Sequence, residues 1–192
     1  MRSDAVTSRA TAPTRSGAVP ERVAALARHL DLDPTDRVIE VGCGTGAAAE
    51  HLLTTHPGIH YVAVDRSATA VRQTLRRNAR FVEEGRLEVV GSELLDVAAR
   101  LPGPARFDKV FAINVNVFWT VLASPEAAVL RHLLGPAGRL CLVYDLPDAR
   151  RTDAVAKRVL RSLDSAGLVG GVRTDGSCLV ITATPPLGRA AR

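Results

Sequence analysis

The sequence predicts an α/β fold, a mostly parallel sheet with helices on both faces. Short apolar runs alternate with helix-patterned segments along most of the chain, which is the order that right-handed βαβ crossovers produce. One apolar run, 38–41, leads into a loop, 42–46, that has glycine at alternate positions and then into a helix start. A second apolar run, 61–64, ends in Asp65. A strand, a tight loop, a helix and a second strand therefore follow one another.

The composition is that of an ordinary globular domain. The chain has 192 residues, of which 46% are hydrophobic and 23% are charged, and this is enough for one core that folds unaided. We expect a single domain over 18–184, a disordered tail over 1–17 and a loose tail over 185–192. The sequence shows neither the apolar core of a signal peptide nor a membrane span, so we expect a cytoplasmic protein without a membrane partner.

The charge balance is basic, with a net charge of +5 and a pI near 9.7, yet the sequence predicts no nucleic-acid partner. Arg72, Arg76 and Arg80 form a stripe on a predicted helix, but only 4% of the residues are aromatic, so no stacking platform accompanies them. We expect a solvated helix face. The cysteines are isolated from one another and from histidines, so the sequence predicts neither a metal site nor a disulfide framework.

The first half of the chain is predicted to alternate helices and strands. Pro20 is typical of a helix start, Ser67 of a helix N-cap and Gly85 of a helix end. The expected elements are, in order, a helix over 20–30, a strand over 37–41, a helix over 47–55, a strand over 59–64, a helix over 67–85 and a strand over 87–90.

The second half continues the alternation. Pro125 marks a helix start, the stretch 135–138 is rich in glycine and proline like a turn, and Gly167 is a helix cap. The expected elements are a helix over 94–100, a turn over 101–104, a strand from 107 that continues to 119, a helix over 125–134, a turn over 135–138, a strand over 139–145, a helix over 149–166 and strands over 169–173 and 177–183.

The glycine loop is predicted to be a ligand cradle. Glycine at positions 42 and 44 lets the chain turn sharply and lets a ligand reach bare backbone. Asp65 stands where a βαβ unit places an acid beside a ribose. The order Gly42-x-Gly44-x-x-Ala47 also fits the relaxed dinucleotide fingerprint, so an NAD-type site stays open. Glu40 argues against NAD, because it places a charge where dinucleotide enzymes keep the strand apolar.

The segments Glu40-x-Gly42-x-Gly44-x-Gly46 and 62–67 (Val-Ala-Val-Asp-Arg-Ser) resemble the first and second motifs of class I S-adenosylmethionine-dependent methyltransferases. The resemblance covers 37–145 by motif and 146–184 by element order alone. It implies a Rossmann-like, seven-stranded sheet that is mostly parallel with an antiparallel last strand. It also implies S-adenosylmethionine as the cofactor and S-adenosylhomocysteine as its product.

The resemblance implies roles for individual residues. Glu40 would anchor the methionine end of the cofactor, the glycines would admit its sulfonium side, and Asp65 would accept both ribose hydroxyls. Family members commonly have an acid that meets the adenine amino group at the position of Ser92, which departs from that pattern. The cofactor-binding residues expected in this chain are Glu40, Gly42, Cys43, Gly44, Asp65, Arg66, Ser92, Glu93 and Asn114.

The carboxyl-terminal end of the fourth predicted strand is expected to bind the acceptor. Asn116, Phe118 and Trp119 lie there, at the edge where open α/β sheets bind ligands, and an amide with two aromatic rings suits a small organic molecule. The stretch 114–118 is similar to the Asn/Asp-Pro-Pro-Tyr/Phe motif of amino-group methyltransferases, but both prolines are missing. We therefore infer no particular acceptor atom.

The sequence thus predicts a small-molecule methyltransferase that works by in-line methyl transfer. Tyr144 and Asp145 end the fifth strand and are the candidate catalytic residues, although this reaction does not require a dedicated base. Two alternatives stay open: an NAD-type oxidoreductase on the same fold and a non-catalytic S-adenosylmethionine-binding regulatory protein. A monomer and a homodimer fit the sequence equally well.

Overall fold

The fold comes from a computed structural model, which describes residues 19–101, 106–120, 122–146 and 151–186 and, at Trp119, the backbone alone. The tail predicted over 1–17 lies outside these residues. So do positions 102–104 of the first predicted turn and 187–192 of the C-terminal tail. The limits of the domain therefore stay predictions.

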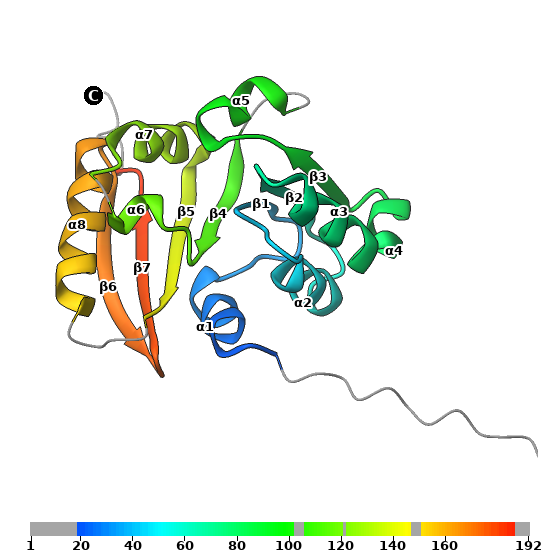
Figure 1. The fold of residues 1–192 in the computed structure, drawn as a ribbon, viewed down its shortest axis with the longest axis horizontal. Coiled ribbons are helices and arrows are strands. Elements are labelled where there is room, and N and C mark those ends of the chain that lie inside the picture. The colour runs from blue at the N-terminus through cyan, green and yellow to red at the C-terminus, as the bar shows by residue number, and fades with distance from the viewer. Residues whose placement is uncertain (1–18, 102–105, 121, 147–150, 187–192) are drawn as a thin grey trace, which may run out of the picture.

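Seven strands form one sheet in the order β3-β2-β1-β4-β5-β7-β6 (Figure 1). Neighbouring strands are parallel except for β7, which is antiparallel to both β5 and β6. This confirms the predicted mostly parallel sheet with an antiparallel last strand. The strands are β1 (Arg37–Val41), β2 (His60–Asp65), β3 (Leu87–Gly91), β4 (Phe107–Ile113), β5 (Leu134–Asp145), β6 (Val169–Asp175) and β7 (Cys178–Thr184).

Helices cover both faces of the sheet, and each face has its own apolar core. α1, α2 and α4 contribute to one core, and α5 to α8 contribute to the other. Strand β1 contributes side chains to both cores, because Val38 faces the first core while Ile39 and Val41 face the second. The helices are α1 (Glu21–Leu30), α2 (Ala47–Thr55), α3 (Ala68–Arg77), α4 (Ala79–Glu83), the 3₁₀ helix η1 (Leu94–Asp96), α5 (Val97–Arg100), α6 (Val117–Thr120), α7 (Ser124–Leu133) and α8 (Thr152–Ser165).

The strand predicted from 107 to 119 is wrong beyond Ile113. Asn114 takes a left-handed conformation, with φ 55°, and asparagine tolerates this region better than most residues. The chain leaves the sheet there and forms the short helix α6. Phe118, which the pattern places on a strand, is instead fully buried in the α5–α8 core.

The helix predicted over 67–85 is divided in two at Asn78. Ser67 caps its first part as predicted. Asn78 leaves the helical region, with φ −112°, and its side-chain amide donates to the carbonyls of Gly46 and Thr74, each at 3.1 Å. Gly46 allows this contact, because a Cβ there would lie 2.6 Å from Asn78 Nδ2. The break therefore ties the helix pair to the glycine loop.

The turn predicted over 135–138 is also wrong, because these residues begin β5. They form an irregularity in the pairing with β4, where the register shifts between Phe107 and Lys109. A Cβ on Gly138 would lie 2.9 Å from the Phe107 carbonyl oxygen. Glycine is thus required because two backbone segments approach closely at this irregularity. Such a site is rich in glycine, as a turn is, so the sequence alone does not distinguish the two.

The arginine stripe lies on the outer surface of the α3–α4 pair. Arg72, Arg76 and Arg80 are all exposed, and Arg80 stacks over the ring of Phe81 with its guanidinium carbon 4.3 Å from the ring centre. This is the solvated helix face that the sequence predicts. Among the residues that the structure describes, no helix is both long and apolar enough to cross a membrane.

We expect Asn78→Ala to lower the free energy of unfolding by about 1–3 kcal/mol, because buried hydrogen bonds are lost. Urea denaturation of the variant and the parent measures the difference. Thr69→Ala on the exposed face of α3 is the control and should stay within about 0.5 kcal/mol of the parent. Equal losses in the two variants would show that the Asn78 side chain does not hold the loop.

Candidate functional site

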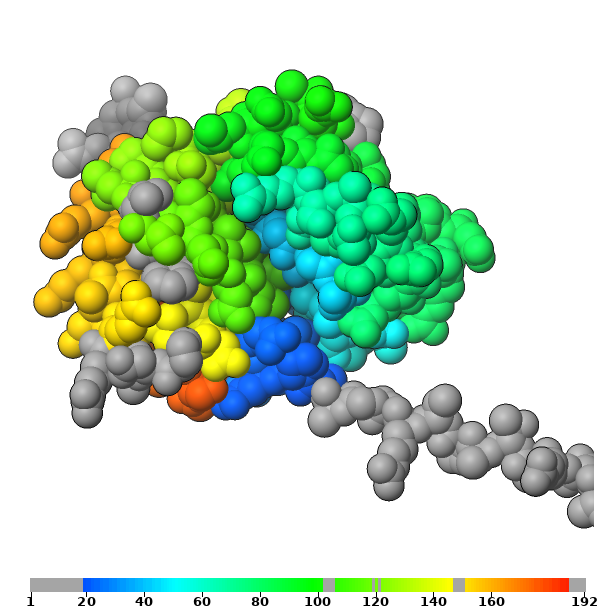
Figure 2. All heavy atoms as spheres, viewed as in Figure 1, coloured from blue at the N-terminus to red at the C-terminus, as the bar shows by residue number. Residues whose placement is uncertain are grey.

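A cavity of about 710 Å³ opens at the carboxyl ends of β1, β2, β3 and β4. Figure 2 shows the crevice on this face of the molecule, between the green segment after β4 and the cyan and teal atoms of β1 to α3. The structure brings seven of the predicted site residues to its wall: Gly42, Asp65, Arg66, Ser92, Glu93, Asn114 and Asn116. Four strand ends therefore converge on one site, as the parallel sheet predicts.

The glycine loop folds back over the end of β2. The amides of Gly42 and Cys43 both donate to the Val64 carbonyl, at 2.8 and 3.0 Å. Gly42 and Gly44 have φ values of 76° and 55°, which glycine adopts without strain. A Cβ on Gly44 would meet no atom within 4 Å. Open space therefore lies beside this backbone, but Gly44 is not among the residues that line the cavity.

Asp65 ends β2 and holds the loop in place. Its Oδ2 accepts the Gly44 amide and its Oδ1 accepts the Ser67 amide, both at 2.9 Å. A carboxylate offers about four acceptor positions, so these bonds leave capacity for a ligand. Asp65 lines the cavity, and its carboxylate therefore joins the loop, the start of α3 and the site.

Glu40 lies among the buried residues and does not line the cavity. It is 2% exposed, and the Tyr61 hydroxyl donates to its Oε2 at 2.6 Å. Burial raises the pKa of Glu40 to about 8, the Tyr61 hydrogen bond opposes this shift, and the charge of Asp65 adds to it. The Glu40 carboxyl is therefore mostly protonated at neutral pH.

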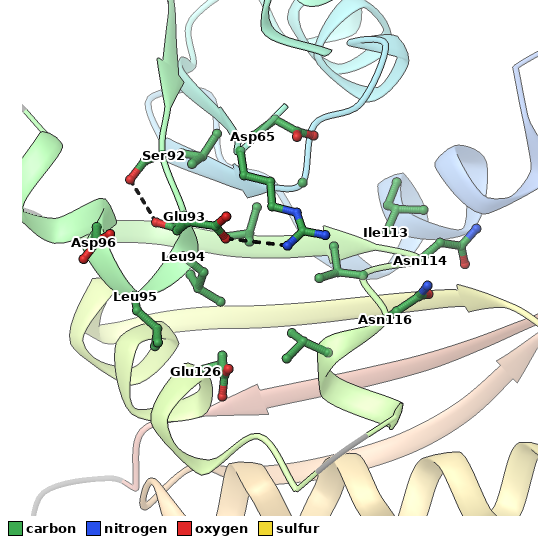
Figure 3. A pocket seen from close by; sticks show the side chains of 16 residues that line it. Asp65, Ser92, Glu93, Leu94, Leu95, Asp96, Ile113, Asn114, Asn116 and Glu126 are labelled. Carbon is green, nitrogen blue, oxygen red and sulfur yellow. Dashed lines mark hydrogen bonds and ion pairs between the residues drawn. The ribbon is translucent and has the colours of Figure 1, made fainter. Parts of the chain in front are cut away.

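The end of β3 contributes polar side chains that are only loosely held (Figure 3). The Ser92 hydroxyl donates to the Glu93 carbonyl at 2.8 Å. Arg66 Nη1 lies 3.9 Å from Glu93 Oε2, with side chains 76% and 60% exposed, so this ion pair contributes little. Ser92, Glu93 and Arg66 can therefore reorient toward a ligand.

The residues predicted for the acceptor are separated by the turn into α6. Asn116 is exposed and lines the cavity. Asn114 lines it too, and its Oδ1 accepts the Asp145 amide at 2.8 Å, which fixes its side chain at the end of β5. Phe118 packs in the core away from the cavity. The side chain of Trp119 lies outside the described part of the chain.

Three other predicted residues do not reach the cavity wall. Tyr144 is 1% exposed in the α5–α8 core, and its hydroxyl has no hydrogen-bond partner within the described ranges. Asp145 is exposed and accepts the Ser177 hydroxyl at 3.4 Å. Cys43 turns inward toward Thr74, and burial raises the pKa of its thiol to about 12. Its thiol is therefore neutral and unreactive.

Part of the wall was not predicted from the sequence. Leu94, Leu95 and Asp96 line the cavity directly after Glu93, and extending the strand-end rule by three residues finds them. Glu126 lines it from the first turn of α7, and no local pattern in the sequence gives its position. Over the residues described, no group of histidine, cysteine and acidic side chains could hold a metal ion.

A family model described as "Methyltransferase domain" matches residues 39–140 of the chain. The match contains the glycine loop, Asp65 and the ends of β3 and β4, so it spans the strand ends that form the cavity.

The names of three curated relatives refer to three different substrates. The chain is 32% identical to a protein-L-isoaspartate O-methyltransferase of Roseiflexus castenholzii, over 83% of this chain and 62% of that protein. It is 30% identical to ribosomal RNA small subunit methyltransferase A of Prochlorococcus marinus, over 65% and 44%. It is 25% identical to a trans-aconitate 2-methyltransferase of Paracidovorax citrulli, over 78% and 55%. The chain thus spans between 44% and 62% of the length of these relatives.

Solved structures agree on the fold. A SAM-dependent methyltransferase from Aquifex aeolicus superposes with a TM-score of 0.68 at 18% identity, over 84% of this chain and 88% of that one. At this identity the likeness extends to the fold alone.

The buried Glu40 predicts a stability that falls as the pH rises. Its folded-state pKa of about 8 lies above the ordinary 4.5, so between these values the folded protein binds the extra proton. The free energy of unfolding should therefore fall by up to about 1.4 kcal/mol per pH unit over this window. Glu40→Gln has no such proton, so urea denaturation should show a flatter dependence on pH. Parallel curves for variant and parent would contradict a neutral Glu40.

Tyr144→Phe should keep or raise the melting temperature, because a buried hydroxyl without a partner costs about 1–3 kcal/mol. The matched change Tyr61→Phe should lower it, since that hydroxyl bonds to Glu40. Thermal unfolding of both variants tests the contrast. A clear loss of stability in Tyr144→Phe would mean that the hydroxyl has a partner in the folded protein.

Proposed function

The chain belongs to the methyltransferase-domain family, and from this premise we propose that it transfers the methyl group of S-adenosylmethionine to a small organic molecule. The cavity at the carboxyl edge of the sheet supports this most directly. It gathers Gly42, Asp65, Ser92 and Asn116 around about 710 Å³, within the range of roughly 300–1,000 Å³ typical of small-molecule sites.

The residues of the cavity fit the nucleoside part of this cofactor. Gly42 lines the cavity, and the open space beside Gly44 would let a ligand approach the loop backbone. Asp65 would accept the ribose hydroxyls with the acceptor capacity that the Gly44 and Ser67 amides leave free. Ser92 and Glu93, at the end of β3, would border the base.

The methionine part would lie over the end of β1 and the start of the turn after β4. Glu40 lies at the end of β1, and an ammonium group placed near it would favour its ionised form. Binding would then release the proton that Glu40 holds when buried. The backbone at Asn114, whose side chain is fixed by the Asp145 amide, would border the same end of the ligand.

The acceptor side of the proposal depends on Asn116. Its exposed amide stands on the cavity wall beside Val115 and Val117, so polar and apolar groups are both available to an acceptor. S-adenosylmethionine supplies a methyl group bound to a sulfonium. The acceptor attacks the methyl carbon in line with the carbon–sulfur bond, and the sulfur leaves as the thioether of S-adenosylhomocysteine. The residues around it need to orient the acceptor and exclude water, and positioning alone can contribute about 7–11 kcal/mol.

The charge of the cavity favours a small molecule over nucleic acid. Among the described residues, its lining carries the carboxylates of Asp65, Glu93, Asp96 and Glu126 and a single cation, Arg66. A site of this kind repels phosphate groups even though the whole chain has a net charge of +5. The family match also supports methyl transfer over NAD chemistry as the interpretation of the glycine loop.

Titration calorimetry tests the proposal with S-adenosylhomocysteine and, as control, NAD. We expect the parent to bind the first and not the second. Asp65→Ala should weaken binding by about 1.5–3 kcal/mol, because a charged acceptor is lost. Asp108→Ala is the matched control, since Asp108 also accepts a backbone amide, that of Arg37, but away from the cavity. Binding of NAD alone would overturn the proposal, and binding without turnover on any small acceptor would favour the regulatory alternative.

A further inference from the structure

Glu126 is an acidic residue at the cavity whose carboxylate forms no hydrogen bond or ion pair with the described residues. It lies in the first turn of α7, is half-buried, and lines the cavity beneath Leu94 and Leu95 in the view of Figure 3. Within the described ranges, its carboxylate has neither a hydrogen-bond donor nor a cation as partner. A partly buried carboxylate without a partner is unfavourable, so a ligand that supplies a donor would remove this cost.

The usual structural role of an acid at this helix position does not account for Glu126. In a capping box, such a side chain accepts the backbone N–H of the N-cap residue. The N-cap of α7 is Ala123, and its N–H donates to the Ser162 hydroxyl at 3.1 Å. The helix dipole favours a negative charge in the first turn, but it does not require the charge to border a cavity.

The position of α7 places Glu126 at the β3 end of the site. The helix packs against η1, and η1 follows Ser92 and Glu93 directly. The Ser92 hydroxyl donates to the Glu93 carbonyl, and the Glu93 carboxylate forms only a weak, exposed ion pair with Arg66. Asp96 and Glu126 both line this end without a side-chain partner within the described ranges, and Glu126 is the half-buried one of the two.

We propose that Glu126 accepts a hydrogen bond from the amino group of a 6-aminopurine ring, and so selects adenine over a 6-oxopurine in the bound nucleoside. This rests on the proposed function, in which the cavity holds S-adenosylmethionine. In that function Asp65 would accept the ribose hydroxyls and the methionine ammonium would lie toward Glu40, so the ring amino group would be the remaining donor. A carboxylate is an acceptor only, so it attracts an amino group and repels an oxo oxygen.

Calorimetry with two ligands tests this: S-adenosylhomocysteine and its 6-oxo analogue, S-inosylhomocysteine. The parent should prefer the adenine compound by about 10- to 100-fold, as one charge-assisted hydrogen bond gives. Glu126→Ala should reduce this ratio to near one. Glu126→Gln should gain affinity for the inosine compound, because an amide can donate to the oxo oxygen.

The control is Asp153→Asn, which removes an acid from the first turn of α8, away from the cavity. It should leave the preference unchanged, and melting temperatures of all variants check that they fold alike. Parent-like ratios in both Glu126 variants, with S-adenosylhomocysteine still bound, would overturn this inference and leave the proposed function standing. Loss of the ratio in Asp96→Asn instead would assign the same role to Asp96. Failure of the parent to bind S-adenosylhomocysteine would reject the proposed function itself.

Discussion

The site depends on one carboxylate, that of Asp65, which accepts hydrogen bonds from two backbone amides. Asp65 accepts amides from the glycine loop and from the start of α3, so the ends of β1 and β2 are held in a fixed relation. The glycines are what allow this, because their left-handed angles turn the Gly44 amide toward Asp65. From the other side, Asn78 donates to Gly46. Hydrogen bonds therefore hold the loop on both sides without a ligand, and preorganisation of this kind lowers the entropic cost of binding.

The sequence was informative wherever a local pattern determines the structure. Strand β1 and helix α2 were predicted to the residue, because an apolar run, a glycine loop and a helix start are read from neighbouring positions. Gly42 and Asp65 were placed at one edge for the same reason, since parallel strands end together. The order of elements predicted the parallel part of the sheet, and the family resemblance supplied the antiparallel β7.

The sequence was misleading where tertiary contacts override a pattern. The run after Ile113 is apolar enough for a strand, but Asn114 turns it out of the sheet and Phe118 fills the core. Tyr144 stands at the predicted strand end, yet the alternation of β5 points its ring to the α5–α8 core. Glu126 is the converse case: it looks like an ordinary first-turn acid, and only the packing of α7 on η1 brings it to the cavity.

The division of the sheet has a consequence for how this protein can change over evolution. Within the described ranges, none of the cavity lining comes from α1, α8, β5, β6 or β7. Apart from the Asp145 amide, which holds Asn114, replacements in that half should act mainly on folding stability, whereas replacements at the ends of β1 to β4 and in the first turns of α6 and α7 should act on the ligand. Selection can therefore alter specificity through a few loop positions. The elements outside the cavity, α1, α8 and β5 to β7, keep the fold stable meanwhile. New specificities become accessible by short mutational paths that leave the scaffold intact.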